Sequence, residues 1–140
     1  MPIDFSPFEK ALSSLKEAVS VFDRDKTNTI VRDSVIQRYE YTYEMAYKML
    51  RRFLLEAESS RQQVEEMFFA DIIRTANARG LLLRDLAQWN RYRRMRNLTS
   101  HTYDEFSADS VVSIIPDFIE DADFLYAKIA GRTVLPGDSV

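Results

Sequence analysis

One long apolar stripe constrains this chain more than any other feature of its sequence. Between Ile30 and Glu58, apolar residues recur every three or four positions, which is the spacing of one face of an α-helix. The stripe comprises Ile36, Tyr39, Tyr43, Ala46, Tyr47, Leu50, Phe53 and Leu54. At ~1.5 Å per residue, such a helix is on the order of 40 Å long. We expect these tyrosines to form a core face.

Helical spacing also marks the rest of the chain. We expect further helices from Ser6 to about Phe22, from Ser60 to Gly80, from Leu86 to about Ser100–Tyr103, and from Ser107 to Ala130. Their expected boundary residues are caps at the starts and glycines at the ends: Ser6 with Pro7 and Glu9, Ser60 with Gln63, Ser107, Gly80 and Gly131. The helix after Ser60 is expected to bury Val64, Met67, Phe68, Ile72 and Ala76. The last helix keeps its spacing across Pro116, which predicts a kink and not a break.

Glycine and proline are too rare for a fold with many turns, because the 140 residues contain only 3 Gly and 4 Pro. The prediction is therefore an all-α protein: an antiparallel up-and-down four-helix bundle with a short extra helical joint at Leu81–Asp85. Residues 1–130 are expected to form a single domain, and residues 131–140 a loose C-terminal tail. Trp89 is expected to anchor the core.

Several functional classes are disfavoured by what the sequence lacks. Without cysteine there is no disulfide framework and no thiolate nucleophile, and a single histidine with scattered carboxylates predicts no metal site. No Gly-rich loop is present, so we expect this chain to bind no nucleotide cofactor itself. The N-terminus does not resemble a signal peptide, and no apolar run approaches a membrane span. A cytoplasmic protein without a membrane partner is the expectation.

Charge is distributed unevenly along the chain. The formal net charge is -3, whereas a general nucleic-acid binder is usually basic. Nevertheless, Arg91–Arg96 contains four arginines and Asp117–Asp123 contains four acidic residues. Any anion-binding site is therefore expected to be local.

The lone histidine, His101, follows directly after the arginine cluster, and two interpretations are open. In the first, His101 ends a helix and the arginines are a solvated face. In the second, Arg96 binds phosphate while His101 transfers protons, a pair that suits RNA cleavage without a metal. These two residues are five positions apart, so an ideal helix would point them ~140° from each other. Either the helix unwinds near Ser100, or the residues reach a site from different sides, as a symmetric dimer would allow.

Two motifs together resemble a known family. Arg96–Tyr103, RNLTSHTY, resembles the Arg-x4-His-x-Tyr motif of HEPN proteins, which include HepT-type toxins. Arg32–Arg52 is similar to the second-helix signature of the nucleotidyltransferase substrate-binding-like branch, with an Ile-Gln-Arg-aromatic-Glu core followed by Tyr-Glu. The similarity extends from about Asp4 to Ile129.

The resemblance implies a homodimeric helical bundle that pairs with a separate minimal nucleotidyltransferase chain, for some members in a toxin–antitoxin module. In those members the HEPN protein is a metal-independent ribonuclease, and the transferase silences it by adding AMP to the motif tyrosine. Carried over, Arg96 and His101 become the candidate catalytic pair and Tyr103 the candidate AMP acceptor. The candidates for substrate binding or support are Asn97, Arg93 and Glu40.

Two functions remain open on this basis: a partner and substrate-presenting module, or an endoribonuclease acting on RNA. The two acidic residues that lie off the tyrosine stripe are also ambiguous, because either could pair with the arginine cluster or face water. We expect Glu44 to face water, and we leave both alternatives open for Glu40.

Overall fold

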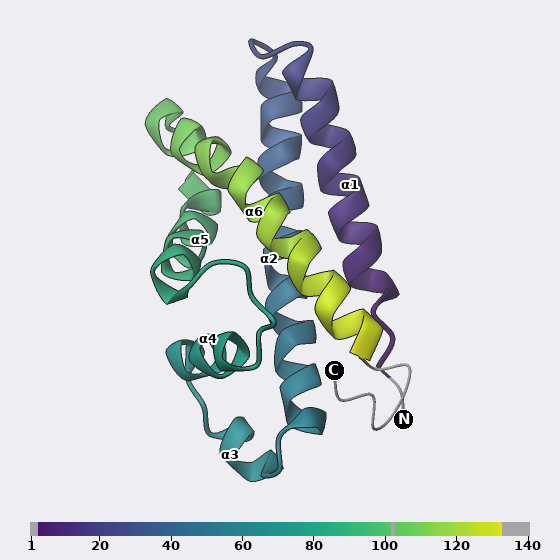
Figure 1. Cartoon of the computed structure of the whole chain (residues 1–140). Helices are drawn as coiled ribbons and strands as arrows, with labels where there is room; N and C mark the ends of the chain where they lie inside the picture. The colour runs from purple at the N-terminus through teal and green to yellow at the C-terminus, as the bar shows by residue number, and fades with distance from the viewer. Residues whose placement is uncertain (1–2, 102, 133–140) are drawn as a thin grey trace.

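Every regular element that the structure describes is helical. This computed structural model describes residues 3–101 and 103–132 (Figure 1). The elements in chain order are α1 (Ser6–Asp23), α2 (Thr29–Ala57), α3 (Arg61–Glu65), α4 (Phe69–Ala78), α5 (Leu86–Leu98), the 3₁₀ turn η1 (Thr99–His101) and α6 (Glu105–Arg132). The predicted all-α class is confirmed.

Four helices make the bundle, and consecutive ones run in opposite directions. Figure 1 shows α1 and α2 side by side and antiparallel, with α6 crossing them diagonally and α5 packed against the first half of α6. The shorter α3 and α4 connect the far end of α2 to α5 (Figure 1). Within the described ranges, no helix is both long and apolar enough to cross a membrane.

An aromatic cluster fills the centre of the bundle. Phe118 of α6 makes edge-on contacts with Tyr39 of α2 at 4.9 Å and with Tyr92 of α5 at 5.3 Å between ring centroids. Trp89 packs edge-on against Tyr92, and all four rings are fully buried. The predicted core roles of Trp89 and Tyr39 are confirmed. Tyr43 is also buried, whereas Tyr47 is only half-buried.

Two of the predicted caps are present. The Ser60 hydroxyl accepts the Gln63 backbone N–H at 3.2 Å, which begins α3. Gly80 ends α4 with a φ of 73°, a left-handed conformation that glycine adopts without a steric penalty. The N–H groups of Gly80 and Leu81 then donate to carbonyls in the last turn of α4, which is the expected C-terminal capping pattern.

The predicted start of α1 at Ser6 is confirmed, whereas the predicted capping role of Ser6 and the predicted start of α6 were wrong. Ser6 is the first residue of α1 and not its cap, because its N–H and hydroxyl both donate to the Asp4 carboxylate. The last helix begins at Glu105, two residues before the predicted N-cap Ser107. Asp104 supplies that function instead, since its carboxylate accepts the Phe106 N–H at 3.2 Å.

The far end of α6 also differs from the prediction. The helix continues through Pro116, as expected, but it then passes Gly131 and ends at Arg132. The remainder of the predicted tail, residues 133–140, lies outside the described residues.

The helix predicted from Ser60 to Gly80 is interrupted. It divides into α3 and α4 around Met67 and Phe68, and Phe68 is 81% exposed instead of buried. Phe69 takes the inward position, because α4 faces the core with Phe69, Ile72, Ile73 and Ala76. The predicted helical joint at Leu81–Asp85 is not helical either; Leu81 and Leu82 are buried there in an irregular connection.

Candidate functional site

The motif helix α5 is fixed to the core by its own aromatic residues. Trp89 and Tyr92 are fully buried, and the Tyr39 hydroxyl of α2 donates to the Tyr92 carbonyl at 2.7 Å. On the other side, the Tyr92 hydroxyl donates to the Asp121 carboxylate of α6. Burial raises the pKa of Tyr92, so its phenol remains a neutral donor. These bonds orient the face of α5 that carries the motif.

Asp121 is fully buried and is satisfied by several donors. Its carboxylate accepts the Arg84 backbone N–H at 3.1 Å and the Arg84 Nη1 group at 3.0 Å, in addition to the Tyr92 hydroxyl. Arg84 also pairs with Glu120 at 2.7 Å. The acidic segment seen in the sequence is therefore used in part to hold the connection before α5 against α6.

The predicted motif is located where α5 ends. Arg93, Arg96 and Asn97 lie in the last turns of α5, and His101 ends the 3₁₀ turn that follows. The α-helical geometry thus stops at Leu98, which agrees with the alternative that the helix changes before His101.

The candidate chemical groups at this end are open to solvent. His101, Asn97 and Arg93 are exposed, and Tyr103 is 87% exposed. The His101 and Tyr103 rings lie edge to face with centroids 6.4 Å apart. A large partner molecule can therefore reach both side chains.

Two glutamates of α2 hold the motif from the side. Glu44 forms an ion pair with Arg96, so the expectation that Glu44 faces water was wrong. This hydrogen bond raises the pKa of Arg96 further above its ordinary value, and the guanidinium stays charged. Glu40 accepts a hydrogen bond from the Thr99 hydroxyl at 2.9 Å, which anchors η1 to α2. Glu40 is thus a support for the motif backbone and not an ion-pair partner of the arginine cluster among the described residues.

A groove of about 520 Å³ adjoins the motif. Arg93, Arg96 and Asn97 of α5 form one wall, and Tyr43, Glu44 and Tyr47 of α2 form another. The third side comprises Met67, Phe68 and Phe69. The groove therefore combines aromatic rings with two arginines, one of which is the candidate catalytic residue Arg96.

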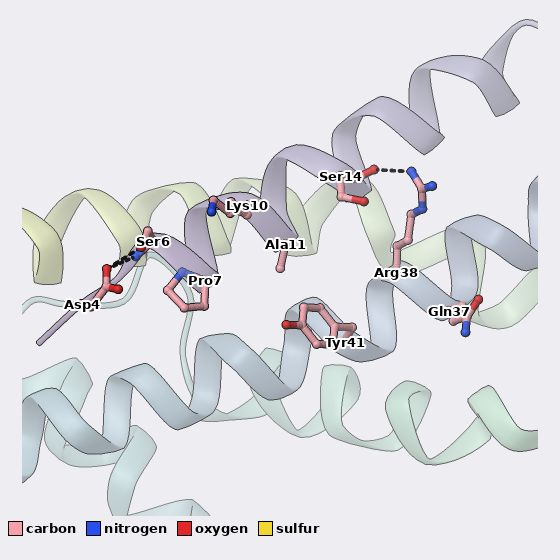
Figure 2. Close-up of a pocket in the computed structure, with 9 residues that line it drawn as sticks. All are labelled: Asp4, Ser6, Pro7, Lys10, Ala11, Ser14, Gln37, Arg38 and Tyr41. Carbon is pink, nitrogen blue, oxygen red and sulfur yellow. Dashed lines mark hydrogen bonds between the residues drawn. The ribbon is translucent and has the colours of Figure 1, made fainter.

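A separate groove lies between α1 and α2. Figure 2 shows Lys10 and Ser14 on α1 above Tyr41 and Arg38 on α2, and the cavity measures about 610 Å³. Arg38 donates to the Ser14 carbonyl at 3.0 Å, so its guanidinium is used to join the two helices. None of the described residues of the Arg96–Tyr103 motif lines this groove, whereas Gln37, Arg38 and Tyr41 of the second-helix signature do.

The arginines of α5 differ in whether a carboxylate pairs with them. Arg96 is paired with Glu44, whereas Arg91, Arg93 and Arg94 form no salt bridge within residues 3–101 and 103–132. Arg93 instead lies over the Phe69 ring, with its guanidinium carbon 4.7 Å from the ring centroid. This part of the acidic protein is therefore locally positive and suited to anions.

The chain also matches a protein-family model over most of its length. The model described as nucleotidyltransferase substrate binding protein like matches residues 3–130, nearly the whole chain. The chain belongs to this family.

Individual members of the nucleotidyltransferase substrate-binding-like family support the assignment. A protein of Haemophilus influenzae described as a probable ribonuclease HepT is 34% identical over 138 residues, covering 93% of this chain and 94% of the relative. The solved structure of a nucleotidyltransferase substrate-binding domain from H. influenzae is similar with a TM-score of 0.83 and 31% identity. A structure from Thermus thermophilus has a TM-score of 0.68 and 30% identity. Each structural comparison covers 91% of this chain and 99% of the solved one.

Sequence reasoning missed part of this site. Glu44 was assigned to solvent, and neither Thr99 nor the aromatic groove was foreseen. A signal for the glutamates exists: Glu40 and Glu44 are four residues apart and share a helix face, as do Tyr43 and Tyr47. The groove had no comparable signal, because it depends on Phe68 leaving the core at the break before α4.

Proposed function

We propose that this protein is the cytoplasmic partner of a separate minimal nucleotidyltransferase, and that the transferase adds AMP to Tyr103. The observation that carries the proposal is the exposure of Tyr103 at the end of the Arg96–Tyr103 motif, on a family member that lacks a nucleotide-binding loop of its own. Tyr39 and Tyr43 are buried, so their phenols cannot reach the active site of another enzyme.

The transfer step is a displacement at phosphorus. The Tyr103 oxygen attacks the α-phosphorus of ATP held by the transferase, pyrophosphate leaves, and a base removes the phenolic proton. A tyrosine phenol has a reference pKa of about 10, so such help is needed near neutral pH. The product carries a bulky anion next to His101.

The experiment combines this protein with its transferase, ATP and magnesium, followed by mass mapping. The expected result is one added AMP on Tyr103 and none on the Tyr103→Phe protein. Tyr41→Phe is the matched control, because Tyr41 is 56% exposed but lies on the α1–α2 groove. AMP on another residue, or unchanged labelling of Tyr103→Phe, would contradict the assignment.

A second function is favoured by the relative described as a probable ribonuclease. In this reaction the RNA 2′-hydroxyl attacks the adjacent phosphorus, the 5′-oxygen leaves, and a 2′,3′-cyclic phosphate forms. His101 accepts the 2′-hydroxyl proton, and Arg96 stabilises the charge on the crowded phosphate. The leaving oxygen needs a proton donor, which His101 of a second copy supplies in a homodimer. AMP on Tyr103 would then block the cleft, as in a toxin–antitoxin pair.

Cleavage of RNA in the presence of a metal chelator tests this second function. His101→Ala is expected to slow cleavage by ~10²–10⁴-fold, the usual effect of losing a proton-transfer group. Arg96→Ala is expected to act similarly without unfolding the protein, since the one ion pair of Arg96 within the described residues is a partly exposed pair with Glu44. Sedimentation should show a dimer; a monomer at micromolar concentration would remove the second histidine that the mechanism requires.

A further inference from the structure

The groove that Arg93, Arg96 and Asn97 line also contains aromatic side chains that phosphate cleavage does not require. We propose that it binds one unpaired base of a single-stranded RNA, next to the phosphate held by Arg96. This inference rests on the proposed ribonuclease function, and it assigns Phe68, Tyr47 and Tyr43 to substrate binding.

One wall of the groove is a stack of planar groups. The Tyr47 and Phe69 rings are stacked at a centroid distance of 5.4 Å with an interplanar angle of 29°. Arg93 lies over the Phe69 ring at 4.7 Å. Because Phe69 is nearly buried, it forms the bottom of the stack. The half-buried Tyr47 and the exposed Arg93 pack against it at the surface.

The rim of the groove holds an aromatic ring that the fold does not bury. Phe68 is 81% exposed, although it stands in a segment whose neighbours pack inward. Exposing a ring of this size forgoes the stabilisation that its burial would bring. A flat nucleobase would cover it, because aromatic side chains provide stacking platforms for unpaired bases.

The interior of the groove holds a phenol with no partner. Tyr43 is only 6% exposed, it lines the groove, and its hydroxyl makes no hydrogen bond within the described residues. Burial raises the pKa of Tyr43, so the hydroxyl is protonated and able to donate. With the exposed amide of Asn97, it can satisfy the hydrogen-bonding edge of a base.

Charge and size also favour RNA over a protein segment. Arg93 and Arg96 line one wall of the groove, and Arg91 and Arg94 on the same helix are not paired with acids among the described residues. A phosphate backbone would be attracted along α5. The volume of about 520 Å³ lies within the usual range for a small-ligand site, and one nucleotide is of that size class.

The test measures binding in the full-length His101→Ala protein, which cannot complete cleavage. Short uracil-only and adenine-only RNA strands are titrated by fluorescence anisotropy, with an RNA duplex for comparison. Phe68→Ala should weaken single-strand binding by roughly 5- to 100-fold, the usual effect of removing one stacking ring. Phe68→Trp should restore it, and the matched aromatic control Tyr41→Ala should have no effect. A strand lacking the base at the bound position should bind the Phe68→Ala and parent proteins equally.

Several results would overturn the inference. Equal affinities of Phe68→Ala and Tyr41→Ala for single-stranded RNA would contradict it. If Phe68→Ala lost RNA affinity and also changed its sedimentation, Phe68 would belong to a dimer interface instead. Loss of transferase binding with unchanged RNA affinity would identify a protein-docking surface instead. The proposed function is judged separately: cleavage that depends on His101 but not on Phe68 keeps the ribonuclease and removes the base site. Binding that depends on Phe68, in a protein that cleaves no RNA, would keep the base site and remove the ribonuclease function.

Discussion

Arg96 is already paired with a carboxylate in this structure. Glu44 on α2 already forms an ion pair with it, and the side chains of both residues are partly exposed. In the proposed ribonuclease, an RNA phosphate would share the guanidinium with this carboxylate or displace it. We therefore expect Glu44 both to position Arg96 and to compete with the phosphate.

The first prediction concerns this competition. Glu44→Gln in the His101→Ala background should tighten RNA binding by roughly 2- to 5-fold, which corresponds to the usual strength of an exposed ion pair. Glu17→Gln is the control, because Glu17 is exposed on α1 and changes the net charge equally. Anisotropy titrations at two salt concentrations measure the effect. If both variants bind alike, Glu44 does not compete with phosphate.

At this scale the sequence predicted which residues are candidates for the chemistry, but it did not predict how they are paired. The spacing of Glu40 and Glu44 reveals their shared face, and the Arg96–Tyr103 motif stands in one unbroken run. Whether a glutamate reaches an arginine depends on the distance between two helices that are far apart in the chain. Periodicity contains no information about that distance, so Glu44 was misplaced.

Among the elements, α4 illustrates how a local conformation sets the stability of a helix end. Gly80 has a φ of 73°, and a Cβ there would meet nothing within 4 Å, so any penalty for alanine is conformational. Gly80→Ala should lower the free energy of unfolding by about 1–2 kcal/mol. Gly131→Ala is the opposite control. Gly131 is helical with equally open surroundings, and alanine should stabilise it by up to about 1 kcal/mol. Urea unfolding followed by circular dichroism measures both; two changes of the same sign would contradict the explanation.

Helices were predicted well where an apolar stripe met a clear boundary signal. The long stripe of α2 and the glycine after α4 are examples, and both reflect local chemistry. The break around Phe68 was not predicted, since no glycine or proline marks it and Phe68 fits the helical spacing as well as Phe69 does. Tertiary packing buries Phe69 and leaves Phe68 exposed, and both residues line the groove.

The molecule as a whole buries several tyrosines, which makes its stability depend on alkaline pH. Burial raises the pKa values of Tyr39 and Tyr43 above their ordinary value of 10.0. Above that pH the unfolded chain loses phenolic protons that the folded chain retains, so the free energy of unfolding must fall as pH rises. Each such tyrosine contributes a slope of about 1.4 kcal/mol per pH unit.

The alkaline prediction is tested with Tyr39→Phe. At neutral pH this protein should be less stable by about 1 kcal/mol, because Tyr39 no longer donates to the Tyr92 carbonyl. Above pH 10 its stability should decline less steeply than that of the parent protein. Urea unfolding from pH 8 to 11, with phenolate absorbance recorded in parallel, measures the slopes. Equal slopes would show that Tyr39 is not protected from ionisation.

The buried carboxylate of Asp121 has a consequence for how this fold can diverge. It ties α6 to Tyr92 of α5 and to Arg84 just before α5, and none of these contacts involves Arg96, His101 or Tyr103. The side chains that fix α5 to the bundle are therefore different from those proposed to carry the chemistry. A lineage that lost the proposed reaction at the exposed end would keep the contacts that hold the bundle together.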